Sequence, residues 1–530
     1  MDTTSTGRTA PTTTSPTLVA QILLFAAIGA AGLAISACST AQTGSGTGSG
    51  TEWLDVSMDG KVAEWPADAS VAMDDQFAYF RLSVQNEQFT LQAAPQTVAV
   101  LIDCDADPAT GKYLYLGKDE QGRAKKLGAD LEIQFSPMNP ADPAKPKKGV
   151  ALFALAKDGS RTAIERGTLD VVFLPTYASP WYELRVSRHM KGRAALPQRG
   201  LFSSGATTGV FVLYGDTRET AGQIVGYADP FGIASPPAPA AAPQWRPTVM
   251  DLPKKESREL RVVSYNVVKS KPLSSPDTFK RIFDALEPDF ILLQEWEADD
   301  KVTQSWFTAL VSSPTGWYVQ ASPAADCAII SRHALTSFGS EAAEGVTNPM
   351  PLREGQTARP WTPRFIGAFA HTPLGTVVLG SGHLKCCGSK DSPEDQLRIA
   401  ETESINRYLH GGLVASPAKM RIIGGDFNLV GSRTPLDVLV RQLDGGQDLA
   451  VAEPVVLGTP IKYTWYDNAT EFTPGRLDYI TYSTSSLEVS RAFVLDTTIL
   501  AEESLYRIGL SPNDTMGSDH LPVVVDFRVR

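Results

Sequence analysis

The chain has 530 residues, which is enough for two or three domains of ordinary size. Hydrophobic residues make up 42% and charged residues 20%, which excludes a chain disordered throughout, and five cysteines are too few for a fold stapled by disulfides. The formal net charge of -11 argues against tight non-specific binding to DNA or RNA, which needs clustered Lys and Arg.

An apolar, uncharged run opens the chain from Leu18 to Ala37. Such a run near the N-terminus is typical of a signal segment or a membrane anchor. Its last residues, Ile35-Ser36-Ala37-Cys38, resemble the bacterial lipobox, in which cleavage leaves a cysteine that carries lipid. We therefore predict a lipoprotein signal peptide at 1–38, a flexible Gly/Ser-rich tether at 39–51, and a lipid-anchored protein that faces outward from the cell envelope, in the periplasm or at the cell surface. An uncleaved transmembrane helix and ordinary secretion are the alternatives.

Residues 52–234 read as many short strands between Gly, Pro, Asp and Asn clusters, which predicts an all-β sandwich domain. Strands are expected at 77–84, 97–102 and 210–213. The segment 235–250 is rich in Pro and Ala, which favours extended backbone, so we interpret it as a semi-rigid linker.

Two features of this first domain suggest ligands. The segment from Glu52 to Pro66, with the loop after Asp103, loosely resembles family-9-type carbohydrate-binding sandwiches, and this resemblance implies a carbohydrate partner. Alternating aspartates in a loop that ends in Gly suit Ca²⁺, so Asp103, Asp105 and Asp107 are candidates for a structural calcium site. A solvated turn is the alternative.

From residue 251 to 530 short apolar runs alternate with helical stretches such as Asp277–Leu286 and Glu394–Tyr408. This alternation predicts an α/β domain built in layers.

Polar motifs follow one another along this second domain, each at the expected end of a strand or in a loop. In chain order they are Ser264-Tyr265-Asn266-Val267, Pro288 to Glu295, Gly380 to Lys385, Gly424-Gly425-Asp426-Phe427-Asn428, and the pair Arg476-Leu477-Asp478-Tyr479 with Gly517-Ser518-Asp519-His520. Phosphoester hydrolysis needs a cation held by hard oxygen ligands, an oriented water that loses a proton, and a donor for the leaving oxygen. Carboxylates, amides and histidines at strand ends form a coherent set for that chemistry.

These motifs and their order resemble the endonuclease/exonuclease/phosphatase superfamily, which includes type-I deoxyribonucleases, apurinic endonucleases, neutral sphingomyelinases and inositol polyphosphate 5-phosphatases. The resemblance implies a four-layer α/β/β/α sandwich and a metal-dependent phosphoesterase. It implies metal ligation by Asn266, Glu295 and Asp519, and catalytic roles for His383, Asp426, Asn428, Asp478 and His520. In these roles Asp426 acts on the attacking water, Asn428 and His520 contact the phosphate, Asp478 orients His520, and His383 serves the leaving group.

Some positions depart from the family pattern or stay open. Val268 stands where many members carry a second acidic or polar residue, which puts a second metal site in doubt. The insert that begins at Cys386-Cys387 should line the rim of the cleft, and a strained disulfide, free thiols and a bridge to a partner are equally open. Arg398 either reaches the site or pairs with Glu401.

The sequence thus predicts a hydrolase at the cell envelope that uses Mg²⁺, with Mn²⁺ or Ca²⁺ as alternatives. Its substrate is a phosphodiester or phosphomonoester in a nucleic acid, a phospholipid headgroup or a small molecule, and no strong affinity for nucleic acid is expected. The alternative is a non-catalytic surface-binding lipoprotein that retains the phosphoesterase scaffold.

Overall fold

Alternating side chains in the central strands decide how the second domain is layered. In a computed structural model, β13 (Glu259–Asn266) and β14 (Phe290–Gln294) point Val262 and Leu292 into one core, and Val263 and Ile291 into another. Successive side chains of a strand face opposite sides of the sheet, so each of these strands is buried on both faces.

The structure describes residues 57–530 except 66–70, 75, 84–89, 106, 119–121, 123, 143–144, 166, 190–207, 215–221, 229–246, 339–342, 352–359 and 416–417. The predicted signal peptide and tether, and residues 235–246 of the predicted linker, lie outside the described residues. Residues Thr51–Arg530 form one compact unit. No helix in the described part of the chain has the length and apolarity that a membrane crossing needs.

The α/β domain (residues 247–530) contains two large sheets within its described residues. The first has the order β15 (Tyr318–Ser322), β16 (Cys327–Ser331), β14, β13, β25 (Val523–Val529), β24 (Leu487–Val494), β22 (Val455–Val456). The second has the order β17 (Ala334–Ser337), β18 (Phe365–Thr372), β19 (Gly375–His383), β20 (Met420–Asp426), β23 (Asp478–Tyr482), β21 (Ala450–Val451).

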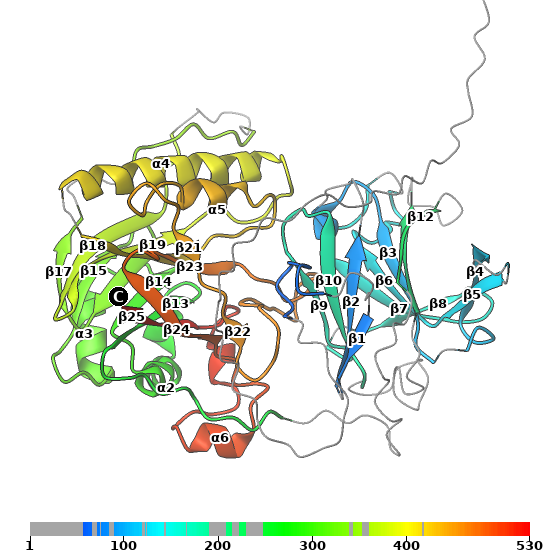
Figure 1. Cartoon of the computed structure of the whole chain (residues 1–530), viewed down its shortest axis with the longest axis horizontal. Helices are drawn as coiled ribbons and strands as arrows, with labels where there is room; N and C mark the ends of the chain where they lie inside the picture. The colour runs from blue at the N-terminus through cyan, green and yellow to red at the C-terminus, as the bar shows by residue number, and fades with distance from the viewer. Residues whose placement is uncertain are drawn as a thin grey trace, which may run out of the picture. The chain divides into compact units, whose positions relative to one another are not determined.

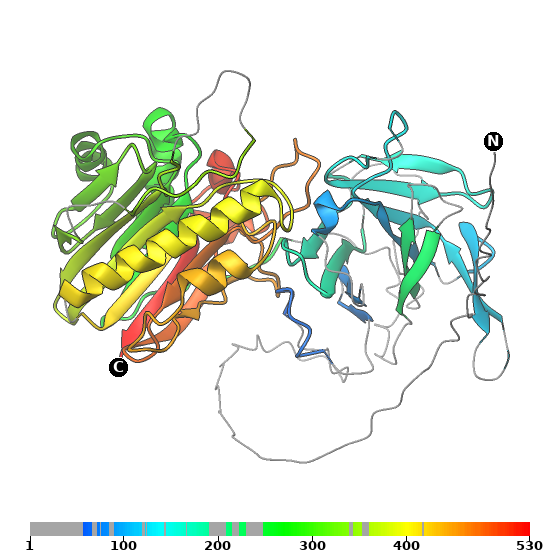
Figure 2. The ribbon, with the colours of Figure 1, turned by 90° about the horizontal axis from the view of Figure 1, so that it is seen from above.

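Helices cover the two outer faces of this pair of sheets. Helices α2 (Pro276–Leu286) and α3 (Asp300–Leu310) pack Phe283 and Trp306 onto the first sheet, beside the short α1 (Lys271–Ser274) and α6 (Glu502–Tyr506). Helices α4 (Pro393–Ala415) and α5 (Thr434–Leu439) pack Leu409 and Leu436 onto the second, as Figures 1 and 2 show. The predicted four-layer α/β/β/α sandwich is therefore confirmed, and both helices expected from the sequence are present.

The first domain, with strands between residues 71 and 228, is all-β. Within its described residues one sheet runs β1 (Val71–Met73), β2 (Phe77–Ser83), β10 (Trp181–Ser187), β9 (Val171–Leu174), and the other β12 (Gly222–Ala228), β11 (Thr208–Tyr214), β3 (Val98–Asp103), β6 (Leu131–Phe135), β7 (Val150–Leu155), β8 (Arg161–Ile164). Their facing side chains form one core in which the rings of Phe135 and Phe173 lie 4.2 Å apart. A hairpin of β4 (Lys112–Lys118) and β5 (Ala124–Ala129) stands beside them. We refer to this region as the sandwich domain.

A strained loop follows β13 and folds around the end of β14. Val268, Lys269 and Ser270 all have positive φ, and at Val268 φ is 35°. The loop is held in this form because Lys269 N donates to Glu295 Oε2 at 3.1 Å and Ser270 N donates to Glu295 O at 2.7 Å. A β-branched residue in the left-handed region costs on the order of 1–3 kcal/mol, so packing elsewhere must offset this strain.

We expect Val268→Gly to stabilise the fold by about 1 kcal/mol, because relief of the strain exceeds the entropy cost of glycine in the unfolded chain. Denaturant unfolding at equilibrium measures the change. Val302→Gly, at an exposed position of α3, is the control and should destabilise instead. A loss of stability in the Val268 variant would contradict the assignment of strain.

Candidate active site

Strand pairing brings the predicted residues to one edge of the two sheets. β13 and β14 are parallel with Asn266 opposite Gln294, so Asn266 lies beside Glu295, the next residue after β14. β19 and β20 are parallel with His383 opposite Asp426, and antiparallel β23 places Asp478 opposite Asp426. Neighbouring parallel strands end at the same edge, so segments far apart in sequence meet there.

Asn266 connects the two sheets at this edge. Its side chain is fully buried, and Nδ2 donates to Glu295 Oε1 at 3.2 Å and to Asp426 Oδ2 at 3.1 Å. Its Oδ1 accepts from Val268 N at 3.1 Å. The amide therefore spaces two carboxylates that would repel each other in direct contact. Glu295 itself is only partly buried and faces the pocket.

Asp426 is the centre of the arrangement. Its Oδ2 lies 3.6 Å from His383 Nε2 and 3.7 Å from His520 Nε2, so two imidazoles flank one buried carboxylate. Burial raises the pKa of Asp426 to about 6, although His520 and His383 act to lower it. A carboxylate with a pKa near neutrality is suited to accept a proton from water.

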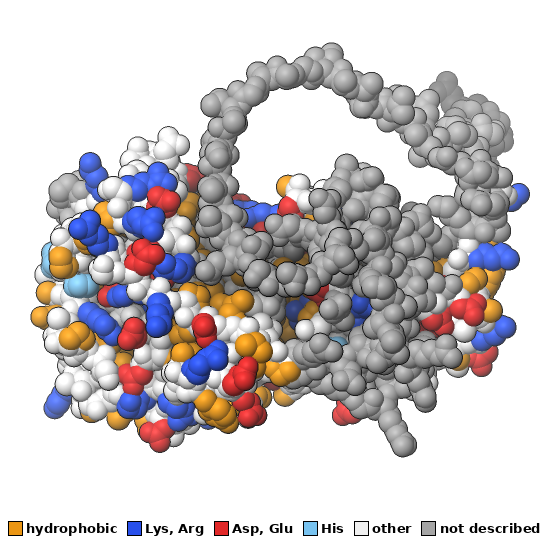
Figure 3. Space-filling model, turned by 60° about the horizontal axis from the view of Figure 1, so that its bottom comes forward, with side chains coloured by type: hydrophobic (Ala, Val, Ile, Leu, Met, Phe, Trp, Pro, Cys, Tyr) orange, Lys and Arg blue, Asp and Glu red, His pale blue; other side chains and the backbone are white. Residues whose placement is uncertain are grey.

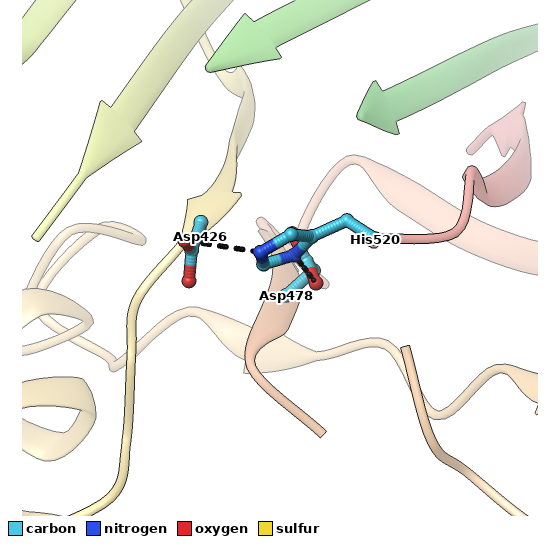
Figure 4. A group of neighbouring side chains, drawn as sticks. All are labelled: Asp426, Asp478 and His520. Atoms are coloured by element: carbon cyan, nitrogen blue, oxygen red, sulfur yellow. Dashed lines mark hydrogen bonds and ion pairs between the residues drawn. The ribbon is translucent and has the colours of Figure 1, made fainter. Parts of the chain in front are cut away.

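His520 is held by Asp478 on its other side. Figure 4 shows the ring between the two aspartates, with Nδ1 2.8 Å from Asp478 Oδ2. Thr464 Oγ1 donates to the same carboxylate oxygen at 2.7 Å and fixes its position. Burial lowers the pKa of His520, but Asp478, Asp426 and Asp519 outweigh it and raise the pKa to about 10. His520 is therefore a cation at neutral pH, as its predicted pairing with Asp478 implies.

His383 has partners that the motifs did not reveal. Its Nδ1 lies 3.0 Å from Asp326 Oδ2 and 2.9 Å from Arg364 Nη1, and the same guanidinium nitrogen contacts Asp326 Oδ2 at 2.9 Å. Asp326 directly precedes β16, and Arg364 directly precedes β18. In the sequence, a single charged residue before an apolar strand indicates only a turn, so neither residue stood out. Each histidine beside Asp426 is thus backed by its own carboxylate.

We expect Asp326→Asn to lower kcat by roughly tenfold to a hundredfold, because His383 loses the group that orients its ring. The KM should change little, since Asp326 does not line the pocket. A double-mutant cycle with His383→Ala measures the coupling. Equal losses from Asp326→Asn with and without His383 would show that Asp326 acts independently of the histidine.

Asn428 and Asp519 complete the predicted set. Asn428 Nδ2 donates to Leu384 O at 3.2 Å, and its backbone N donates to Asp426 Oδ1 at 3.1 Å. Trp465 Nε1 donates to Asp519 Oδ2 at 3.0 Å, which fixes the indole beside the pocket. The tryptophan therefore positions a site carboxylate, a role that the sequence did not suggest.

Backbone strain is concentrated at the same edge. Glu295, Asp326 and Asn428 have φ of 54°, 55° and 49°. Non-glycine residues adopt this left-handed region rarely and only where the surrounding structure holds them. Gly425, one residue before Asp426, allows a close approach of strands, because a Cβ there would lie 1.9 Å from Gly382 O. The site is preorganised by the backbone as well as by side chains.

The polar residues present fit a divalent cation. Asp519 Oδ1 is buried without a hydrogen-bond partner among the described residues, and Glu295 and Asp519 both line the pocket. A buried carboxylate oxygen is costly without a cation or a donor. The ligand atoms of Asp426, Asp478 and His520 also lie within 4.8 Å of one another, a set that was not predicted to hold metal. His520 Nδ1 is already paired with Asp478, so we retain Glu295, Asn266 and Asp519 as the predicted ligands. Asn266 would ligate through Oδ1, which has a second lone pair beside the one that accepts from Val268 N.

The Cys386-Cys387 insert lines this pocket, as predicted. Both residues are free thiols, and their Sγ atoms lie 3.0 Å apart. The contact with Cys387, together with Lys385, lowers the pKa of Cys386 to about 5. Arg398 holds this loop instead of reaching the catalytic groups or pairing with Glu401, because Nη1 donates to Cys387 O at 2.7 Å and to Lys385 O at 2.8 Å.

The predicted calcium loop of the sandwich domain differs in one member. Asp103 and Asp105 lie together, but the third carboxylate of the cluster is Asp130 and not Asp107. Asp107 is exposed, and its Oδ1 accepts from Ala109 N within its own turn. Asp130 was missed because it lies beyond the β4–β5 hairpin, 26 residues after Cys104 in sequence, and reaches the cluster only through strand pairing.

Residues 263–520 match the model of the Endonuclease/Exonuclease/phosphatase family. A comparison with curated protein sequences returns no match. The predicted carbohydrate-binding resemblance of the sandwich domain is not confirmed, so its carbohydrate partner stays a prediction.

Solved structures similar to this chain cover about half of it. The catalytic domain of human Nocturnin with bound sulfate is 19% identical over 52% of this chain and 97% of its own, with a TM-score of 0.35. An endonuclease/exonuclease/phosphatase from Bacteroides vulgatus is 13% identical over 51% and 99%, with a TM-score of 0.34. The 3′ phosphatase NExo from Neisseria, bound to a product DNA hairpin, is 17% identical over 51% and 99%, with a TM-score of 0.31.

Proposed function

Because its residues 263–520 belong to the endonuclease/exonuclease/phosphatase family, we propose that this protein is a divalent-metal-dependent hydrolase of phosphoesters, held at the outer side of the cell envelope by a lipid. One observation carries the catalytic part of the proposal: the buried carboxylate of Asp426 lies between the Nε2 atoms of His383 and His520, at 3.6 and 3.7 Å. This arrangement offers a proton acceptor and two donors within one small space.

The metal would be held by Glu295, with Asn266 and Asp519 as further ligands, and Mg²⁺ is the first choice for such oxygen donors. When bound, it would neutralise charge that develops on the phosphoryl oxygens. Mn²⁺ and Ca²⁺ accept the same ligand types and remain alternatives to be compared in the assay.

The chain's own residues divide the rest of the reaction. Asp426 accepts a proton from the attacking water, for which its pKa of about 6 is suited. His520, charged through Asp478, donates to a phosphoryl oxygen. His383 donates a proton to the leaving oxygen, and its ring is held ready by Asp326. Asn428 is placed beside Asp426 because its backbone N donates to the Asp426 carboxylate. Its side-chain amide binds phosphate without adding negative charge.

The charges on one face of the molecule support a compact substrate more than a long polyanion. On the face shown in Figure 3, basic and acidic side chains are interspersed over the described residues. A nucleic-acid footprint would require Lys and Arg gathered in a stripe or patch. The net charge of -11 supports the same reading.

A phosphoester panel tests the catalytic proposal. Purified full-length protein with Mg²⁺ is assayed against nucleic acid, phospholipid headgroup esters and small phosphomonoesters and phosphodiesters. Hydrolysis of at least one class by the wild type, and its loss in Asp426→Asn, is the expected result. Binding of these compounds without hydrolysis of any would instead favour the non-catalytic alternative.

The lipid anchor has its own test. The motivation is the Ile-Ser-Ala-Cys end of the apolar run. Mass spectrometry of the N-terminal peptide from native membranes should find a lipidated Cys38 at the start of the mature chain. An unmodified Cys38 within a longer peptide would rule the anchor out.

A further inference from the structure

The sandwich domain contacts the loops that carry the catalytic residues. Thr176 Oγ1 donates to Leu429 O at 2.7 Å, next to Asn428, and Ala178 N donates to Gly431 O at 2.8 Å. Gln92 and Thr473 exchange two hydrogen bonds, of 3.1 and 2.9 Å, in the segment that leads to Asp478.

A third contact reaches the rim insert, because Lys390 N donates to Thr90 Oγ1 at 2.9 Å. Apolar packing joins the same two regions, since Met58 and Leu174 belong to the core between the two α/β sheets. These contacts are buried or partly buried, so the sandwich domain fixes the position of the loops on one side of the site.

The catalytic pocket consequently has walls from both domains. It encloses about 420 Å³, and its catalytic end is formed by Glu295, His383, Asp426, Asn428, Asp519 and His520. The facing wall includes Thr90, Gln92, Ala93, Lys148 and Thr176 of the sandwich domain. A pocket of this volume is of the size that takes small molecules.

Among the described residues that line the pocket, Lys148 is the one lysine, and no arginine is present. Its side chain is exposed and forms no hydrogen bond or ion pair within the described part of the chain. Its charge acts on Cys387 and Glu394, at the rim. The charges that act most on Asp426 are instead those of His520, Asp478 and His383, so Lys148 belongs to the entrance and not to the catalytic end.

We propose that the sandwich domain supplies the substrate-selecting wall of the catalytic pocket, and that Lys148 binds a second anionic group of the substrate, separate from the scissile phosphate. The inference rests on the proposed function and extends it. At the catalytic end the charge of His520 is already paired with Asp478, and the carboxylates Glu295, Asp426 and Asp519 would repel a second anion. An uncommitted cation at the entrance therefore gives selectivity. The substrate class is a compact phosphoester that carries a further phosphate or carboxylate.

Matched inhibitors test this role with the full chain. Alkylphosphonates and α,ω-bisphosphonates of increasing chain length cannot be hydrolysed and differ only in the second anion. We expect one bisphosphonate length to inhibit about tenfold more strongly than the matching monophosphonate, the gain typical of one charge-assisted contact. Lys148→Ala should bring this ratio close to one, and Lys148→Arg should retain it.

The neighbouring Lys147 gives the control, since it is exposed but does not line the pocket. Lys147→Ala should keep the wild-type ratio. Equal ratios in the wild type and both alanine variants would overturn the role of Lys148. Failure of the protein to hydrolyse any phosphoester would overturn the proposed function instead. The role of Lys148 would then be decided by calorimetry, as the ratio of bisphosphonate to monophosphonate affinity in the wild type and the variants.

Discussion

Replacing His520 by alanine should lower turnover by a factor on the order of 10² to 10⁴, the range for a positioned acid–base group. Mg²⁺ affinity should remain nearly intact, because His520 Nδ1 is committed to Asp478 and Nε2 faces Asp426. Steady-state kinetics and calorimetric titration separate the two effects. His371→Ala, on the exposed face of β18, is the matched control and should leave both quantities unchanged.

The pH dependence of the wild type follows from the same group. The pKa of His520 is raised from 6.5 to about 10, because the carboxylates around it outweigh its burial. Its charge therefore stabilises the fold fully below pH 6.5, and this contribution is lost as the pH rises through about 10. Turnover should decline over the same alkaline range, and this decline should be absent in His520→Ala. Unchanged activity in His520→Ala would contradict the role of His520 in the chemical step.

Replacing Glu295 by glutamine should weaken Mg²⁺ binding and activity together. Its carboxylate follows a fully buried strand and faces the pocket, held by Asn266 and by the strained loop at Lys269. Removal of a residue that only hydrogen-bonds to a metal ligand lowers metal affinity about tenfold or more. Removal of the negative charge of a ligand itself should lower Mg²⁺ affinity at least as much.

Calorimetric Mg²⁺ titration measures the change in affinity, and excess Mg²⁺ should recover part of the lost activity. Glu297→Gln is the control, because that side chain is exposed two residues further on. An unchanged Mg²⁺ affinity in Glu295→Gln would move the metal to other ligands, of which the Asp426, Asp478 and His520 cluster is the nearest candidate.

The layers of the α/β domain were predictable because its signals are local. Apolar runs such as 290–294 are too short for a helix and lie buried on both faces, and the periodic stretch after Pro276 became α2 almost unchanged. The motif residues at strand ends meet because neighbouring parallel strands end at the same edge of a sheet. This can be predicted once the order of the strands in the sheet is known.

Other parts of the site depend on long-range packing that a local pattern does not reveal. Asp326 and Arg364 reach His383 from positions just before two separate strands, β16 and β18, and neither residue belongs to a motif. Lys148 lies at the pocket only because Thr90 and Gln92 hold the sandwich domain against the catalytic loops, and these contacts are not visible in the sequence. The turn at Val268 could not be foreseen either, because a β-branched residue disfavours the backbone that it adopts there.

Removal and return of the metal tests the central claim most directly. Full-length protein is stripped with a chelator, and hydrolysis of the best phosphoester of the panel is followed as Mg²⁺ is added back. We predict that activity is absent in the stripped protein, returns with a saturable dependence on Mg²⁺, and requires higher Mg²⁺ in Glu295→Gln. Full hydrolysis by the stripped protein, or none at any Mg²⁺ concentration, would contradict a metal-dependent phosphoesterase.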